Sequence, residues 1–372
     1  MERIYLDNSA TSFPKADGVA KAMYDFLTRD CSNINRGESY TVFSNESKIY
    51  NLRALLATFY GAEDVDCVFF ALNATDAINT FINGFFQEGD EALITCYEHN
   101  AVVRPLTLHN IPYTQIKCDE QFNLILDDND VNEKTKAIIA SGGSNLLGNA
   151  TDIKALSSFA KKHNLPLLID TSQASPYLSI ALDRCDGVFF TGHKGFLGPQ
   201  GTGGMILKRE IAEVLRPKNA GGTGSFSYDL NQPNIFPDKF EAGTQNIVGL
   251  IGLKKAMHYV IENREMIYNK AMEHVHTLIN GLKDIKGLEI VNKDPKLPLL
   301  SLSSTSIDVA ELNNYINEKY GIEARVGVLC APLALDLIKR DGVLRLSPSH
   351  KTSKEEIDIT IKAIKEGVNE LL

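Results

Sequence analysis

The sequence predicts an α/β fold, in which a mostly parallel seven-stranded sheet is covered by helices on both faces and followed by a smaller α+β unit. Seven short apolar runs alternate with helical patterns between residues 67 and 207. Most of these runs are continuously apolar, which is typical of strands buried on both faces of a parallel sheet. Beyond about residue 250 the alternation becomes less regular, which indicates a separate α+β unit.

The strands of the sheet are predicted from the apolar runs in chain order. They cover residues 67–72, 91–96, 111–117, 136–140, 165–170, 187–191 and 203–207. Helical patterns lie between several of them, at about 73–86, 100–109 and 152–163. A helix between two strands lets the chain return and pair in parallel.

The C-terminal part starts with a long helical pattern over residues 250–283. Short strands are predicted at 288–291, 299–303, 324–327 and 343–347, with helices at 309–319 and 354–371. We expect a large domain over residues 16–250 and a small domain formed by residues 1–15 and 251–372.

The composition indicates a folded protein with an acidic surface. Of 372 residues, 38 are Lys or Arg and 47 are Asp or Glu, which gives a formal net charge of −9. Such a surface repels phosphate backbones and argues against a nucleic-acid partner. The apolar runs fall far short of the roughly 20 residues of a membrane helix, and the chain opens without a secretory signal. We therefore expect a cytoplasmic protein with no membrane contact.

The six cysteines are scattered without a CxxC pair. This pattern fits neither a disulfide framework nor a zinc site, and we expect no metal. In a reducing compartment most of them should be buried, unreactive thiols. They are Cys31, Cys67, Cys96, Cys118, Cys185 and Cys330.

Ligands of open α/β sheets bind at the carboxyl ends of strands. We therefore look for catalytic and ligand-binding side chains at the ends of the predicted strands. Lys194 lies in the Gly-rich turn Thr191-Gly192-His193-Lys194-Gly195, after the strand 187–191. It is either an amine placed to condense with an aldehyde or a solvated lysine in a loop. The residue order excludes a Walker A phosphate loop.

Three other strand ends carry polar groups. Asp170 ends the strand 165–170, and it is a helix cap, a magnesium ligand or a carboxylate facing a pyridinium nitrogen. The run Asn73-Ala74-Thr75-Asp76 starts a helix whose free N–H groups suit a phosphate, although a plain Thr cap explains it as well. His99 begins the next helix and is either an exposed cap or a flat ring for stacking.

These four features together describe one cofactor. A lysine for an aldehyde, a carboxylate for a pyridinium, a phosphate site and a flat ring are the parts that pyridoxal phosphate needs. Because all four occur at strand ends, they favour this cofactor more strongly than any one of them does alone.

Several short motifs also occur in a fixed order along nearly the whole chain. They include Tyr5-Leu6-Asp7-Asn8-Ser9-Ala10-Thr11, Asn35-Arg36-Gly37, Glu98-His99-Asn100, Ser144-Asn145-Leu146-Leu147-Gly148, Thr191-Gly192-His193-Lys194, Phe240-Glu241-Ala242-Gly243-Thr244 and Arg345-Leu346-Ser347. In these motifs the chain resembles the class V branch of the fold-type I pyridoxal-phosphate enzymes, within it the cysteine desulfurase and selenocysteine lyase group. The resemblance implies the fold-type I architecture and a homodimer with shared active sites.

The resemblance implies a role for each matched residue. Lys194 would bind the cofactor aldehyde, His99 would stack on the ring and assist proton transfer, and Asp170 would pair with the ring nitrogen. Gln173 would contact the ring hydroxyl. The phosphate would be held by Ala74, Thr75, Thr191 and His193, and by Thr244 from the partner subunit. Arg345 and Asn145 would bind the carboxylate of an amino-acid substrate, for which a guanidinium is well suited.

The resemblance also implies the reaction, in which L-cysteine becomes L-alanine and an enzyme thiolate takes up the sulfur as a persulfide. Cys330 is the expected thiolate, because its spacing from Arg345 resembles the compact-loop, type II desulfurases. A small buried core residue is the alternative for Cys330. The relatives usually have His before this cysteine, whereas this chain has Val328-Leu329. Selenocysteine is a further expected substrate, and a sulfur-acceptor protein is a candidate partner.

Two other hypotheses stay open at this point. A different class V reaction, that of an aminotransferase, a β-lyase or an epimerase, would keep the cofactor without using Cys330. A degenerate scaffold that only binds a sulfur-transfer partner would keep the fold alone, but the complete set of Lys194, Asp170, His99 and Arg345 argues against it.

Overall fold

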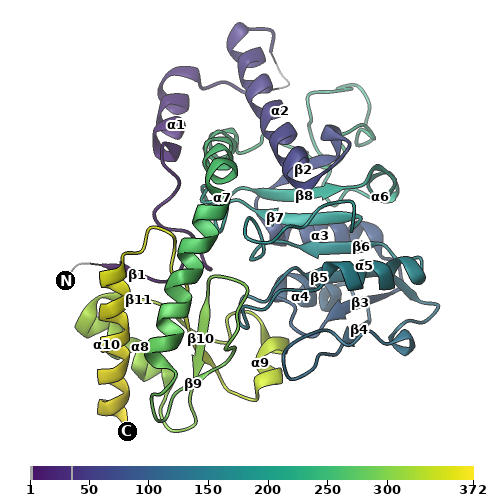
Figure 1. The fold of residues 1–372 in the computed structure, drawn as a ribbon. Helices are drawn as coiled ribbons and strands as arrows, with labels where there is room; N and C mark the ends of the chain where they lie inside the picture. Colours follow the sequence, from purple (N-terminus) through teal and green to yellow (C-terminus); the bar gives the residue numbers. More distant parts are fainter. Residues whose placement is uncertain (1–2, 35–36) are drawn as a thin grey trace.

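The computed structural model describes residues 3–34 and 37–372, so Asn35 and Arg36 of the motif Asn35-Arg36-Gly37 lie outside the described residues. Its centre is a seven-stranded sheet in the order β2-β8-β7-β6-β5-β3-β4 (Figure 1). The strands are β2 (Val68–Ala71), β3 (Glu91–Thr95), β4 (Tyr113–Ile116), β5 (Thr135–Ser141), β6 (Leu167–Asp170), β7 (Gly187–Thr191) and β8 (Gly203–Leu207). Each predicted strand is confirmed, with small shifts at the ends.

The sheet is mostly parallel, as predicted. β8 is antiparallel to both of its neighbours, β7 and β2, and the other neighbouring strands pair in parallel. A loop rather than a helix joins β7 to β8, and a direct connection of this kind returns the chain in the opposite direction. The carboxyl ends of β3, β5, β6 and β7 therefore meet at one edge of the sheet.

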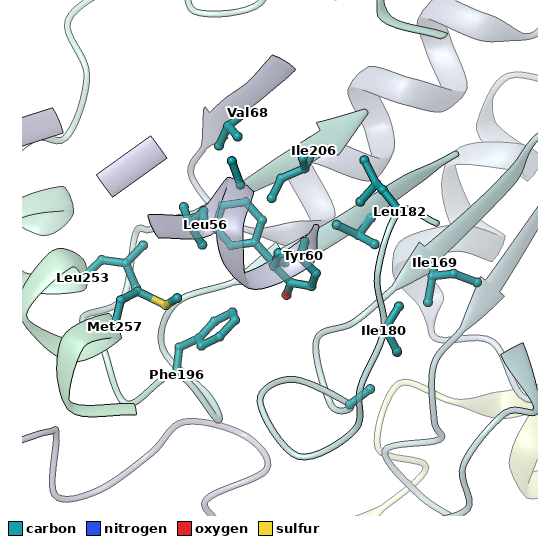
Figure 2. Close-up of a cluster of buried hydrophobic side chains, with 14 of the residues drawn as sticks. Leu56, Tyr60, Val68, Ile169, Ile180, Leu182, Phe196, Ile206, Leu253 and Met257 are labelled. Carbon is teal, nitrogen blue, oxygen red and sulfur yellow. The ribbon is translucent and has the colours of Figure 1, made fainter. Parts of the chain in front are cut away.

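Helices cover both faces of this sheet. Successive strand residues point to opposite faces, so the apolar side chains of Phe189 and Phe190 belong to two different clusters, one under each layer of helices. One face packs against α3 (Ala74–Phe85), α4 (Asn100–Leu108) and α6 (Arg209–Val214). The other face packs against α2 (Tyr40–Tyr60), α5 (Ile153–Lys162) and the first half of α7 (Ile247–Leu282). Figure 2 shows part of this second cluster, which includes Tyr60 of α2, Met257 of α7 and Ile206 of the sheet.

The C-terminal unit has its own core and a four-stranded antiparallel sheet in the order β12-β13-β10-β9. Its strands are β9 (Glu289–Ile290), β10 (Leu300–Ser303), β12 (Arg325–Gly327) and β13 (Val343–Leu346). The helices α8 (Val309–Tyr320) and α10 (Lys354–Leu371) and the second half of α7 pack against it. These elements match the predicted ones closely.

The N-terminal segment lies against this C-terminal unit. β1 (Ile4–Tyr5) pairs in parallel with β11 (Ile322–Glu323), and Asp7 forms a bridge with Ser347. This pairing supports our proposal that residues 1–15 and 251–372 form one domain and residues 16–250 the other.

The 21-residue helix α2 was not among the predicted elements. Its buried residues, such as Ile49, Leu52 and Leu56, recur at helical spacing, but the opposite side carries the exposed rings of Phe43 and Tyr50. The apolar residues therefore surround the helix and mask its periodicity. The remaining short elements are α1 (Val19–Asp25), α9 (Pro332–Ile338) and helical turns at Phe26–Asp30, Val65–Cys67 and Asp128–Asp130. Among the helices of residues 3–34 and 37–372, each is too short or too polar to cross a membrane.

Candidate active site

A cavity of about 230 Å³ opens at the carboxyl ends of the parallel strands. It brings together nine of the predicted site residues, which are Ala74, Thr75, His99, Asn145, Asp170, Gln173, Thr191, His193 and Lys194. Three predicted residues, Thr244, Cys330 and Arg345, do not line it.

Lys194 lies in the loop between β7 and β8, which is closed by short backbone contacts. Gly192 N–H donates to the Thr202 carbonyl at 2.8 Å, and Leu197 N–H donates to the Lys194 carbonyl at 2.8 Å. Gly192 leaves no room for a Cβ, because one would collide with the side chain of Thr202. Burial lowers the pKa of Lys194 to about 8, although the nearby Asp170 carboxylate raises it. Within the described chain its amine has no hydrogen-bond partner, so it is free for a ligand.

Asp170 and Gln173 approach the cavity from the end of β6. Asp170 is buried, and its Oδ1 accepts a hydrogen bond from Ser172 N–H at 2.9 Å. Its Oδ2 has no hydrogen-bond partner among residues 3–34 and 37–372, although a buried carboxylate needs one. Gln173 Nε2 donates to the Ser9 carbonyl at 2.9 Å, which leaves the side-chain oxygen of Gln173 for a ligand.

His99 caps the start of α4, and its ring is held in one orientation. Nδ1 accepts a hydrogen bond from Ala101 N–H at 3.0 Å, so the proton of the neutral ring lies on Nε2. Burial lowers the pKa of His99 to about 4, and the charge of Lys194 lowers it further. At neutral pH this ring is therefore an uncharged donor at the wall of the cavity.

Glu98, which precedes His99 in the chain, is fully buried and joins two strands of the sheet, a role that was not predicted. Its carboxyl group accepts from Ser141 N–H at 2.6 Å, from the Ser141 hydroxyl at 2.9 Å and from the Thr95 hydroxyl. These contacts tie the end of β3 to the end of β5. Burial raises the pKa of Glu98 to about 7.

The start of α3 provides an anion site. Asn73 caps this helix by accepting from Asp76 N–H at 2.9 Å, and the N–H groups of Ala74 and Thr75 have no partner within the described chain. His193 Nδ1 is also buried without a hydrogen-bond partner there. Burial, together with the charges of Lys194 and a neighbouring lysine, lowers the pKa of His193 to about 4. Free N–H groups at a helix start suit a phosphate.

Cys330 lies outside the cavity, in an adjoining groove that Thr75 and His99 also line. Its side chain is exposed, so the alternative of a buried core residue is wrong. Leu329 and Cys330 both have left-handed backbone conformations, with φ of 55° and 57°. The loop is held by Asn145 Nδ2, which donates to the Leu329 carbonyl at 2.6 Å, and by Asn100 N–H, which donates to the Cys330 carbonyl at 2.8 Å. The thiol is thus presented at a fixed place beside His99.

Of the other cysteines, Cys67, Cys96 and Cys185 are buried, as expected. Cys118 is partly exposed and Cys31 is exposed. The part of the chain that the structure describes contains no group of three or more His, Cys, Asp or Glu side chains arranged to hold a metal ion.

Arg345 is buried beside the cavity and contacts Asn145 and Asp7. Its Nη1 donates to the Asn145 carbonyl at 2.9 Å, and its Nη2 donates to Asp7 Oδ1 at 2.9 Å. Its positive charge lowers the pKa of both Lys194 and His99, which places it within electrostatic range of them. The side chain of Asn145 donates to the Leu329 carbonyl, whereas its backbone carbonyl accepts the hydrogen bond from Arg345.

Thr244 is exposed and lies apart from the cavity of its own chain. The preceding Glu241 is buried, where it pairs with Arg53 at 2.5 Å and accepts from Phe70 N–H at 2.7 Å. The buried contacts of Glu241 therefore fix the segment Phe240-Glu241-Ala242-Gly243-Thr244, and its last residue, Thr244, lies at the surface.

Known proteins are similar to this chain in fold and in sequence. The solved apo structure of a cysteine desulfurase from Thermococcus onnurineus has a TM-score of 0.90 at 25% identity, over 99% of this chain and 95% of that chain. A probable cysteine desulfurase from Borreliella burgdorferi is 31% identical over 99% of this chain and 92% of its own length. One from Ureaplasma parvum is 28% identical over 98% and 93%. The family model of class-V aminotransferases matches residues 4–360, which include all of the cavity residues, and the chain therefore belongs to the class-V aminotransferase family.

Proposed function

We propose that this protein is a pyridoxal-phosphate-dependent cysteine desulfurase, which converts L-cysteine to L-alanine and passes the sulfur to Cys330. The observation that carries the proposal is the exposed Cys330 thiol on a loop held beside His99. A cysteine that served only packing would be buried, as Cys67 and Cys185 are. The similar proteins are named cysteine desulfurases, which supports the same reaction.

Enzymes of this family depend on pyridoxal phosphate, and the cavity fits it. The free N–H groups at the start of α3 and the unpaired Nδ1 of His193 suit its phosphate. The free oxygen of Asp170 suits a protonated ring nitrogen, the oxygen of Gln173 suits the ring hydroxyl, and Thr191 would complete the phosphate site. When bound, the cofactor supplies an aldehyde for an amine and a ring that withdraws electrons from the substrate Cα.

Three side chains would then act on the amino acid. The Arg345 guanidinium would bind the substrate carboxylate through its unused N–H groups. Lys194, with a pKa of about 8, holds an appreciable neutral fraction near pH 7 and would take the Cα proton and later return it to Cα of the product. His99 would cover the face of the cofactor ring and donate from Nε2.

Cys330 would complete the reaction as a thiolate that attacks the substrate sulfur. A bond forms between the two sulfur atoms as the Cβ–S bond of the substrate breaks, and Cβ gains a proton and leaves as the methyl group of alanine. The charge of Cys330 raises the pKa of Lys194, so the two groups are within electrostatic range. The sulfur stays on Cys330 as a persulfide.

We also propose a homodimer in which Thr244 reaches the phosphate in the partner subunit. Thr244 is exposed in one chain, and two apolar side chains of the same region, Tyr228 and Leu230, are fully exposed. Large exposed apolar side chains of this kind often mark a protein interface. Activity on selenocysteine, a sulfur-acceptor protein and a cytoplasmic location stay predictions.

The experiment that tests the desulfurase proposal compares wild type with Cys330→Ser in turnover of L-cysteine. We expect wild type to form alanine and transferable sulfur in equal amounts, and Cys330→Ser to lose this activity while it keeps the absorbance of the bound cofactor. Cys31→Ser is the matched control, because Cys31 is also exposed but lies outside the site. Full alanine formation by Cys330→Ser would contradict the proposal.

One observation favours a second candidate, a class V reaction that does not use Cys330. Val328, which is 43% exposed, and the buried Leu329 stand where an imidazole usually precedes the cysteine, so the loop brings no histidine to the thiol. An aminotransferase would leave its cofactor in the pyridoxamine form after one amino acid, whereas a desulfurase returns it to the aldehyde form. The cofactor spectrum after a single turnover distinguishes the two.

A further inference from the structure

Asp7 joins two arginines of the C-terminal unit to the N-terminal segment. Its Oδ1 accepts a hydrogen bond from Arg345 Nη2 at 2.9 Å, and its Oδ2 accepts from Arg325 Nε at 2.9 Å and from Arg325 Nη2 at 2.7 Å. Asp7 is 8% exposed and Arg345 is 2% exposed. One buried carboxylate therefore holds two guanidinium groups, one on each oxygen.

These contacts fix the orientation of Arg345 without using all of its donors. Nη1 and Nη2 each make one hydrogen bond, to the Asn145 carbonyl and to Asp7, and Nε is buried without a partner in the described chain. A guanidinium carries five N–H groups, so three of them are left for a ligand. Asp7 is the only ion-pair partner of Arg345 among residues 3–34 and 37–372.

Asp7 also balances the charges of the two arginines. Burial lowers the pKa of the Arg345 guanidinium, and the charge of Arg325 lowers it further, whereas Asp7 opposes both. Without Asp7, a buried cation would lie near a second cation with no counter-charge, which is a costly arrangement. We therefore expect loss of the Asp7 charge to release the Arg345 guanidinium from its present position.

The backbone holds Asp7 in register with the strand that carries Arg345. Ser347 N–H donates to the Leu6 carbonyl at 2.6 Å, and Asn8 N–H donates to the Ser347 carbonyl at 3.2 Å. Ser347 directly follows β13, to which Arg345 belongs. Residues on both sides of Asp7 are therefore bonded to the end of β13, and the carboxylate cannot shift along it.

We infer that Asp7 is a positioning residue for recognition of the substrate carboxylate. It holds Arg345 with its free N–H groups available, so that the α-carboxylate of an amino acid meets a cation already in place. The inference rests on the proposed function only in so far as the substrate is an α-amino acid. It does not depend on the sulfur chemistry at Cys330.

The test compares wild type and Asp7→Asn, both loaded with pyridoxal phosphate, in binding L-alanine and ethylamine. Ethylamine is L-alanine without its carboxylate, and both ligands are followed by the change in cofactor absorbance. The substitution keeps the shape of the side chain and removes its charge. We expect the Kd of L-alanine to rise about tenfold or more, the scale of one charge-assisted hydrogen bond, and the Kd of ethylamine to stay unchanged.

Glu323→Gln is the matched control. Glu323 pairs with Arg3 at 2.7 Å and ties the same N-terminal segment to β11, away from Arg345. This variant should bind both ligands as wild type does. An unchanged Kd of L-alanine in Asp7→Asn would overturn the inference, and so would an equal loss of both ligands or a wild type with no preference for L-alanine. Failure of the desulfurase proposal would instead appear as wild type that binds L-alanine but does not turn over L-cysteine.

Discussion

The pKa of Lys194 leads to a quantitative prediction about uptake of the cofactor. An amine must be neutral to attack an aldehyde, and burial lowers the pKa of Lys194 to about 8. The neutral fraction is then about 9% at pH 7 and about 91% at pH 9, so the rate should rise about tenfold between them. An ordinary lysine with a pKa of about 10.4 would be neutral in only about 0.04% of molecules at pH 7, some 200-fold less.

The assay mixes the cofactor-free protein with pyridoxal phosphate in stopped flow and follows the aldehyde absorbance from pH 6 to pH 10.5. The rate should be half-maximal near pH 8 and level off above about pH 9, because an amine with a lowered pKa loses its proton at a lower pH. His99 and His193, with pKa values of about 4, stay neutral over this range and add no step. Lys194→Ala should show no saturable uptake.

Cys330→Ser serves as the control for a neighbouring charge. A thiolate at Cys330 raises the pKa of Lys194, so its removal should move the midpoint slightly to lower pH without changing the plateau. A rate that does not change between pH 7 and pH 9 would refute the reasoning. So would a rate that still increases beyond pH 10, as for an exposed lysine.

Two variants test how the site is supported. Glu241→Gln should lower the free energy of unfolding by about 3–5 kcal/mol, measured by urea denaturation, because it leaves the buried Arg53 without its counter-charge. Asn145→Ala should speed alkylation of Cys330 by iodoacetamide severalfold and slow sulfur transfer. It removes the hydrogen bond to the Leu329 carbonyl that holds a loop in a left-handed conformation, which costs about 1–3 kcal/mol per residue.

Each of these variants has a direct check. Lys162→Gln breaks an exposed ion pair with Asp128 and should change the free energy of unfolding much less than Glu241→Gln does, so an equal loss in the two variants would contradict the role of burial. For Asn145→Ala, an unchanged alkylation rate would show that other contacts hold the loop. The cofactor absorbance should stay the same in Asn145→Ala.

The sheet and the cavity could be predicted from the sequence because their signals are local. Each strand is a short apolar run, and Asp170 and Lys194 occur directly at or after the ends of such runs. Parallel pairing then brings these ends to one edge of the sheet. A chemically unusual residue at a strand end was therefore enough to place it in the cavity.

Contacts between residues that lie far apart in the sequence could not be predicted, because they leave no local pattern in either segment. Asp7 lies 338 positions before Arg345, and Asn145 lies 184 positions before Leu329. Nothing in either segment alone shows that they meet. The hydrogen bond from Asn145 to the Leu329 carbonyl was likewise not predicted, and the role of Asn145 as a carboxylate ligand stays a prediction.

The pairing of the N-terminal segment with the end of β13 has a consequence for biosynthesis. Asp7 leaves the ribosome 338 residues before Arg345, which at about 5–20 residues per second is a wait of roughly 20–70 s. During that time the large sheet, which ends at Leu207, is already complete in sequence. Lys194 at the end of this sheet is thus synthesised well before Arg345, so the proposed cofactor site can form before Asp7 has its arginine partner.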